Sequence, residues 1–372
     1  MNIPFVLALL GTGFIGGQIL SVSIMSGVRV SFLDVTLAAV LLFGAYKSRK
    51  PFDSAQGKRR FIPRLWAPIL AFTLVSLISR GDLFYIIRWL LYAALYWVTA
   101  DAFFPPRLWR NILAVSGIGI ALLGFVQYVL YPDLRNLYYL GWDPHYQRLF
   151  STLLDPNFTG IIMAFTALIL LPMLRRGKSP WVVGGLMATL GALLLTYSRS
   201  SIGAFVVGLV VWGMFTKRTV LVAAIAFGFI MTFAVLPHTG EGRNVFRTVS
   251  SFARIDSAKQ ALTLIREKPI LGHGIRPRAG IDTSLLFLAE STGVVGVLVY
   301  GWLLVSLCRL GVRGLAYKKT REEAASYLSV LAALLVHSLF VNSLFYPWVM
   351  AWVWVSTGAL EQEVYPRSGD YG

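Results

Sequence analysis

The sequence predicts an all-α protein, a polytopic membrane bundle of about twelve transmembrane helices. Of its 372 residues, 56% are hydrophobic and 14% are charged, whereas an average soluble domain has roughly a quarter of its residues charged. Apolar runs of about 20 residues recur from end to end, and each is long enough to cross a hydrocarbon core roughly 30 Å thick. The whole chain, 1–372, is therefore predicted to form a single integral membrane domain.

The expected spans follow one another without an intervening soluble region. They cover residues 3–22, 31–46, 65–79, 83–100, 110–131, 158–174, 181–197, 200–216, 219–236, 284–308, 322–342 and 345–361. The first span has no basic residues before it and no small-residue cleavage site after it. We therefore expect a retained helix here, not a removed signal peptide.

The distribution of basic residues predicts the orientation. Lys and Arg cluster in the loops 46–64, 175–178, 217–218 and 309–321, and such loops face the cytoplasm in multi-span proteins. Both termini are then cytoplasmic, in a cytoplasmic (inner) membrane. The formal net charge of +17 is accounted for largely by these loops facing anionic lipid headgroups. Nucleic-acid binding is not expected, because the basic residues form no contiguous platform studded with aromatic rings.

Two long segments, 132–157 and 237–283, are expected on the external face. The second carries eight Lys and Arg residues, against the usual depletion of positive charge there, which indicates an anionic partner. Ile255, Leu262 and Ile265 belong to a helical pattern that stops at Pro269. This pattern predicts a helix with its apolar side on the bilayer or bundle, where it could also serve merely as a cap.

Arginines at or near membrane depth are the main candidates for binding an anion. Arg199 lies in a tight turn between two apolar spans, and Arg88 lies inside the fourth span. Ionisable groups at this depth are costly and usually functional. Snorkelling to the headgroups is the alternative for Arg199. Because the guanidinium fork holds phosphate oxygens bidentately, Arg148, Arg199 and Arg254 would form a pyrophosphate clamp if they converge.

Several short motifs occur in order around the predicted outer face. They are Arg148 with Asp155-Pro156-Asn157-Phe158-Thr159-Gly160, the turn Thr196-Tyr197-Ser198-Arg199, Arg254 with Pro269-Ile270-Leu271-Gly272-His273-Gly274, then Leu285, Leu288, Ala289, Glu290, Gly293 and Gly296, and finally His337-Ser338-Leu339-Phe340 with Asn342. In these features residues 145–345 resemble the bacterial O-antigen ligase and polysaccharide polymerase family.

The resemblance implies a glycosyltransferase that takes a glycan from a polyprenyl-pyrophosphate carrier. It would pass this glycan to a hydroxyl acceptor, a glycan or glycolipid, on the outer side of the membrane. The expected substrate-binding residues are Arg148, Arg199, Arg254, Asn157, Arg88 and His337. Pyrophosphate is already a good leaving group, so arginines that stabilise its charge could suffice. We therefore expect no cofactor and no metal, and the sequence offers no compact cluster of metal ligands.

One departure concerns the general base. The family usually has a His-Asn pair before the Glu-x-x-Gly segment, and here Ile281 and Asp282 occupy those positions. The substitutes considered are Asp282, Glu290 and His273, because the base must accept the acceptor's proton near neutral pH. Glu290 could instead form a buried ion pair, and His273, between glycines, is expected to be exposed. His337 could likewise be a packing residue.

Other interpretations stay open at this stage. Tyr138, Tyr139, Trp142 and Tyr146 could stack on sugars or simply lie at the bilayer interface. A transporter or flippase of an anionic glycolipid is a rival function, although no internal repeat is visible. A family member that binds glycolipid without turnover is the third reading. Ligase and polymerase are not distinguished.

Overall fold

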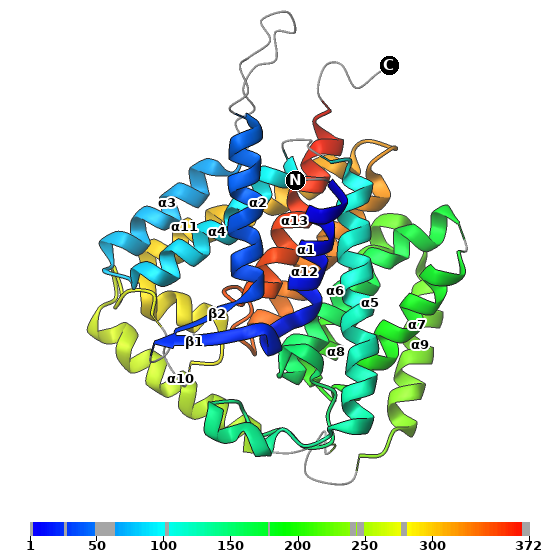
Figure 1. Cartoon of the computed structure of the whole chain (residues 1–372), viewed down its shortest axis with the longest axis horizontal. Coiled ribbons are helices and arrows are strands. Elements are labelled where there is room, and N and C mark those ends of the chain that lie inside the picture. The colour runs from blue at the N-terminus through cyan, green and yellow to red at the C-terminus, as the bar shows by residue number, and fades with distance from the viewer. Residues whose placement is uncertain are drawn as a thin grey trace, which may run out of the picture.

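The computed structural model describes residues 3–25, 28–48, 64–100, 104–177, 179–238, 243, 249–276 and 281–366. The described residues are mostly helical, with 78% helix and 3% strand, and Figure 1 shows how the helices are arranged. The helices are α1 (Ile3–Gly16), α2 (Phe32–Ser48), α3 (Trp66–Ile78), α4 (Leu83–Ala100), α5 (Pro106–Leu130), α6 (Pro156–Arg176), α7 (Pro180–Leu195), α8 (Arg199–Thr216), α9 (Thr219–Val235), α10 (Val249–Glu267), α11 (Ser284–Leu315), α12 (Arg321–Ser338) and α13 (Pro347–Val364).

Five of these helices are long and apolar enough to cross a membrane, namely α4, α5, α6, α8 and α11. Shorter apolar helices accompany them, among them α3, α7 and α9. Each expected span overlaps a helix in the described residues. The helical fold class is therefore confirmed, whereas the number of about twelve crossings stays a prediction.

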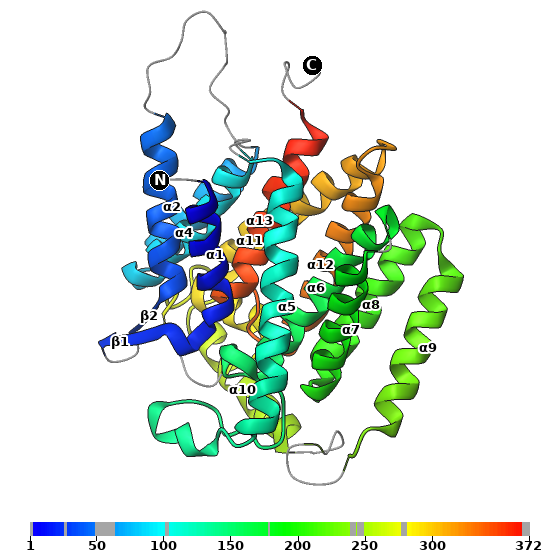
Figure 2. The same cartoon turned by 45° about the vertical axis from the view of Figure 1, so that its right-hand side comes forward.

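Helix α6 lies in the interior of the bundle and packs against α5, α7, α8 and α12, an arrangement visible in Figure 2. Small residues permit these close approaches. A Cβ added to Gly160 would lie only 2.6 Å from Cβ of Ser201 on α8. This contact brings the first turns of α6 and α8 together, where the candidate site lies.

The first predicted span ends earlier than expected. Helix α1 stops at Gly16, a 3₁₀ turn follows over Gly17–Leu20, and a hairpin of β1 (Ser21–Met25) and β2 (Val28–Ser31) continues the chain. Gly17 has a φ of +58°, and a Cβ on it would lie 2.3 Å from the carbonyl oxygen of Thr152. The helix ends because the backbone turns against a distant loop at a position that only glycine fits.

The expected helix in the segment 237–283 is present as α10. Together with the hairpin, α10 lies at the end of the bundle away from the chain termini (Figure 1), which we call the α10 end. Residues 239–242, 244–248 and 277–280 of this segment lie outside the described residues, as do 49–63 of the basic loop. The segment 132–157 contains two short 3₁₀ helices, Arg135–Leu140 and Ser151–Leu153.

Helix α11 is interrupted at Gly293, which has φ +61° and ψ −168°. The segment Pro269–Ile275 fills this break. Val294 N–H donates to the carbonyl of Pro269 at 2.9 Å, and His273 N–H and Gly274 N–H donate to the carbonyls of Glu290 and Ser291 at 2.9 and 2.8 Å. The backbone groups freed by the break are thereby satisfied within the protein. We call this arrangement the clasp.

Candidate functional site

The site is built on two capped helix starts. Asp155 caps α6, and its Oδ1 accepts hydrogen bonds from the N–H groups of Asn157 and Phe158 at 2.6 and 3.2 Å. Ser198 caps α8, where its side chain accepts a hydrogen bond from Ser201 N–H. Caps of this kind satisfy otherwise unpaired N–H groups. They fix Asn157 and Arg199 in the first turns of neighbouring helices.

A buried polar network joins α6, α8 and α12. Ser198 Oγ donates to Asn157 Oδ1 at 2.9 Å, and Ser201 Oγ lies 3.1 Å from His337 Nε2. His337 Nδ1 lies 2.6 Å from Ser343 Oγ. Both ring nitrogens of the fully buried His337 therefore have partners, the arrangement expected of a packing histidine. A direct contact of Asn157 or His337 with substrate stays a prediction.

Arg199 and Arg254 lie close enough at the α10 end for the charge of Arg199 to act on Arg254. Arg199 is exposed in the first turn of α8, and Arg254 is half-buried on α10. Desolvation lowers the pKa of Arg254, the charge of Arg199 lowers it further, and the carboxylate of Asp282 opposes both. Two neighbouring cations at a helix N-terminus, whose dipole is itself positive, favour an anion between them.

Asp282 lies next to this pair, just before α11. Its pKa is raised by desolvation first, while the charge of Arg254 lowers it. Its N–H donates to Ser257 Oγ on α10 at 2.9 Å. Ile281, the preceding residue, is 5% exposed and packs in the apolar core. Of these two neighbours only Asp282 is ionisable, and it lies close enough to Arg254 to interact with its charge.

Arg148 is buried against the Thr196–Arg199 turn. It is 3% exposed, and its Nε donates to the carbonyl of Thr196 at 2.8 Å. This bond positions the turn that carries Arg199. The sequence did not indicate that Arg148 would be buried and bond the main chain of this turn. The expected contact of Arg148 with pyrophosphate stays a prediction.

Arg88 has a partner that the sequence did not suggest. Its Nε and Nη2 donate to the two carboxylate oxygens of Asp34 at 3.1 and 2.8 Å, and Nη2 also bonds the carbonyl of Arg29. The two side chains are 15% and 10% exposed. This bidentate pair neutralises the charge that drew attention to Arg88.

The clasp holds the other two candidate bases. Glu290 is fully buried and accepts a hydrogen bond from Ser291 Oγ at 3.0 Å. His273 was expected to be exposed, which is wrong, because its side chain is only 11% exposed. Its Nε2 faces the carbonyl of Leu264 at 3.0 Å, since the glycines around it pack tightly on the α11 break.

One group of side chains could hold a metal ion. Ligand atoms of Asp143, His145 and Asp155 all lie within 4.8 Å of one another, although these residues showed no compact pattern in the sequence. Asp155 is engaged as a helix cap, and the charge of Asp143 helps to raise its pKa after desolvation. Oxygen and imidazole ligands suit several divalent ions, so the expected metal independence needs an experiment.

Comparison with known proteins gives one match in this part of the chain. Residues 184–300 match the family model for O-antigen ligase, and this region contains Arg199, Arg254, His273, Asp282 and Glu290. The match supports assignment to the O-antigen ligase and polymerase family, as the sequence resemblance indicated. A search of curated proteins finds no relative that matches the chain. The five apolar helices and the family together point to a membrane protein of the bacterial inner membrane that acts in polysaccharide biosynthesis.

Proposed function

Taking the match of residues 184–300 to the O-antigen ligase family as the premise, we propose that the chain is a membrane glycosyltransferase. It moves a glycan from a polyprenyl-pyrophosphate carrier to a hydroxyl of an acceptor glycan or glycolipid. We place this reaction at the α10 end and assign that end to the outer face of the cytoplasmic membrane. The basic turns 217–218 and 309–321, which lie at the opposite end of the bundle (Figure 2), support this orientation.

The observation that carries the proposal is the pairing of Arg199 with Arg254. Their mutual repulsion disfavours the empty site and is relieved when a pyrophosphate lies between them. Phe340 lies beneath Arg254, with its ring centroid 5.9 Å from Cζ, and limits the positions that this side chain can take. Such preorganised donors stabilise charge that develops in a transition state.

The proposed reaction is a substitution at the anomeric carbon of the donor sugar. The acceptor oxygen forms a bond to this carbon, and the bond from the carbon to the pyrophosphate oxygen breaks. The bonding electrons leave with the pyrophosphate, where Arg199 and Arg254 balance the added charge. The acceptor's proton passes to the carboxylate of Asp282, whose raised pKa brings it closer to the range of a useful base.

Asp282 suits this role better than the other two candidates. Glu290 is fully buried behind the clasp, and His273 directs its Nε2 to a main-chain carbonyl. Both arrangements favour structural roles. Ile281, at the usual histidine position, lies in the core, so the neighbouring Asp282 is the group that an acceptor can reach.

One observation favours the rival function of a transporter or flippase. Broken helices are typical of transporters, and α11 is broken at Gly293. In transporters, however, the freed backbone groups line a substrate cavity. Here they bond the segment Pro269–Ile275, which favours an enzyme with a fixed framework.

Release of polyprenyl pyrophosphate from a lipid-linked oligosaccharide, in the presence of acceptor, tests the proposal. The purified protein in proteoliposomes is expected to release it, and Arg254→Gln is expected to slow release by about a hundredfold, the loss typical of removing one preorganised donor. Arg266→Gln is the matched control, because Arg266 is an exposed arginine on the same helix. Tight donor binding without release would instead support the transport or binding-only function.

A further inference from the structure

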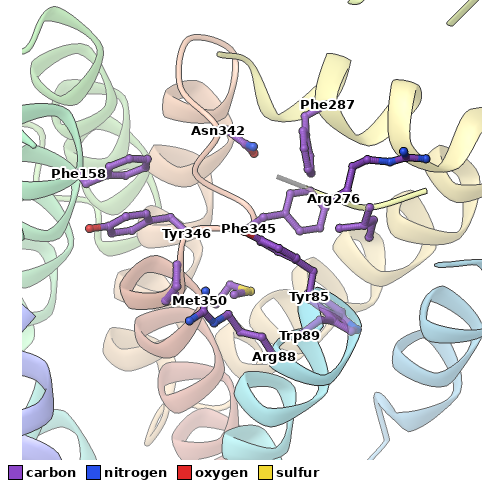
Figure 3. Close-up of a pocket in the computed structure, with 12 residues that line it drawn as sticks. Tyr85, Arg88, Trp89, Phe158, Arg276, Phe287, Asn342, Phe345, Tyr346 and Met350 are labelled. Atoms are coloured by element: carbon purple, nitrogen blue, oxygen red, sulfur yellow. The ribbon is translucent and has the colours of Figure 1, made fainter. Parts of the chain in front are cut away.

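A cavity of about 250 Å³ plays no part in the mechanism above, and neither Arg199 nor Arg254 lines it. It lies between α4, the start of α11 and the loop 339–346 that joins α12 to α13 (Figure 3). Its walls are mostly aromatic and include Tyr85, Trp89, Phe287 and Phe345. The volume is a little below the roughly 300–1,000 Å³ of pockets for drug-sized ligands, so it suits a single ring.

We propose that this cavity binds one neutral sugar ring, a unit of the glycan or of its acceptor. This inference rests on the proposed function, because it names a subsite for that reaction. The aromatic faces would pack against the C–H face of the ring. Two polar groups, from Asn342 and Arg88, would then bond its hydroxyl groups.

Asn342 supplies the first polar group. Its Oδ1 is buried and has no hydrogen-bond partner in the described part of the chain, and Figure 3 shows the amide beside the aromatic walls. A buried amide oxygen without a partner costs free energy, which a ligand hydroxyl would recover. If the amide were flipped, an N–H donor would face the same space, and a hydroxyl could satisfy either orientation.

Arg88 supplies the second. Its Nε and Nη2 are occupied by Asp34 and by the carbonyl of Arg29. Nη1 has no hydrogen-bond partner within the described ranges. It is therefore a donor held rigidly in place by an ion pair. Because Asp34 balances the charge, the donor suits a neutral oxygen better than a phosphate.

These features argue against the other parts of a lipid-linked donor. A polyprenyl chain would leave the Asn342 oxygen and Arg88 Nη1 without partners. A pyrophosphate would have Arg276 as a cation at the cavity edge, but this exposed side chain already donates to the carbonyl of His273. In Figure 3 its guanidinium extends away from Asn342 and Tyr346. A hydroxyl-rich neutral ring satisfies all the groups together.

The position of the cavity fits this use. The loop 339–346 forms part of its wall and also carries Phe340, which lies beneath Arg254. Phe158, next to Asn157 in the chain, stacks on Tyr346 with ring centroids 3.6 Å apart and planes 3° apart. The cavity and Arg254 therefore share the loop 339–346, and the start of α6 lines the cavity with Phe158 while Asn157 bonds Ser198, the residue before Arg199. Two subsites for one extended substrate would require such a connection.

Binding of free sugars to the full-length protein in detergent tests the inference without any donor. Saturation-transfer NMR would be run with the methyl glycosides of glucose, galactose and N-acetylglucosamine. At least one is expected to bind, and Asn342→Ala and Phe345→Leu are each expected to weaken binding by about tenfold. Phe227→Leu, which removes an aromatic ring that is 65% exposed on α9, is the control and should leave binding unchanged.

Three results would overturn the inference. They are no saturable binding of any of these sugars, binding that is equal in the wild type and both cavity variants, and displacement of the sugar by farnesol or inorganic phosphate. Circular dichroism of each variant checks that it is folded. The sugar-binding test involves no turnover, so the two proposals can fail separately. If the protein binds sugar but never releases polyprenyl pyrophosphate, only the proposed function is contradicted. Release by a protein that binds no sugar would contradict only this inference.

Discussion

Gly293 lies directly against the carbonyl of Ile270: a Cβ built on Gly293 would be 2.2 Å from that oxygen. The same residue has a φ of +61°, a value that L side chains rarely adopt. Both the close contact and the positive φ require glycine at position 293, because the segment Pro269–Ile275 packs into the break that this residue makes in α11. The clasp therefore depends on the absence of a single methyl group.

Gly293→Ala is expected to lower the free energy of unfolding by about 3 kcal/mol, from backbone strain together with the loss of clasp hydrogen bonds. Thermal unfolding in detergent, followed by tryptophan fluorescence, measures the change. Gly301→Ala is the control in the same helix, since a Cβ at Gly301 would meet nothing within 4 Å. Equal melting temperatures for the two variants would contradict the description of the clasp.

The pair of Arg88 and Asp34 is expected to stabilise the fold. Removing one partner with Asp34→Asn leaves a largely buried guanidinium without its counter-charge, at a cost of about 3 kcal/mol. Asp133→Asn is the control, because it breaks the more exposed pair of Arg135 and Asp133, whose side chains are 46% and 26% exposed. Its cost should be less than about 1 kcal/mol. Thermal unfolding of the two variants compares these costs, and equal costs would contradict the role given to burial.

Transfer is expected to decline in acid as Asp282 takes up a proton, because only its carboxylate accepts the proton of the acceptor. Burial raises the pKa of Asp282 and the charge of Arg254 lowers it. Removing that charge with Arg254→Gln should move the acid limb of kcat/KM to higher pH. Profiles for the wild type, Arg254→Gln and Arg266→Gln test this. An acid limb at the same pH in all three would exclude Asp282 as the base.

Transfer is expected to survive treatment with EDTA, because arginines can stabilise the departing pyrophosphate. Assays before and after chelation, with Mn²⁺ added back, check this expectation. If activity is lost and then restored by Mn²⁺, the group of Asp143, His145 and Asp155 becomes the candidate metal site. Asp143→Asn should then abolish the response, whereas Asp133→Asn, which changes another carboxylate of the segment 132–157, should not.

Ile281→His is expected to bring no gain of activity. The side chain at 281 is 5% exposed and lies in the apolar core, so an imidazole there would be desolvated and remote from the acceptor. The release assay measures the outcome. A large gain from an inactive baseline would show instead that the chain is a degenerate family member and that the histidine position is open to substrate.

The helices could be predicted from the sequence because their signals are local. Residues 83–100 were expected as a span and form α4 with the same bounds, since apolar length and the turn residues at each end determine them. The twelfth expected span, 345–361, corresponds to α13, which begins at Pro347. Proline at the first position of a helix is itself a sequence signal.

The remaining features depend on contacts between distant parts of the chain. The early end of α1 follows from Gly17 meeting Thr152, and the eleventh span stops at Ser338, before the expected 342, because His337 and Ser343 bond across the following turn. Sequence reasoning named Arg199 and Arg254 as parts of one site. It did not identify Asp34 as the partner of Arg88, and no local pattern could have done so.

The clasp also has a consequence for the order in which the protein is made. Its hydrogen bonds join residues 269–274 to residues 290–295, and a Cβ on Gly274 would lie 2.5 Å from the carbonyl oxygen of Arg80, in the turn between α3 and α4. During synthesis the N-terminal helices are available first. The first turns of α11 must be synthesised before the clasp can form and hold α10 against them. The arginine pair therefore assembles late, so a nascent chain that is truncated before Val295 would reach the membrane without α10 held in place by the clasp.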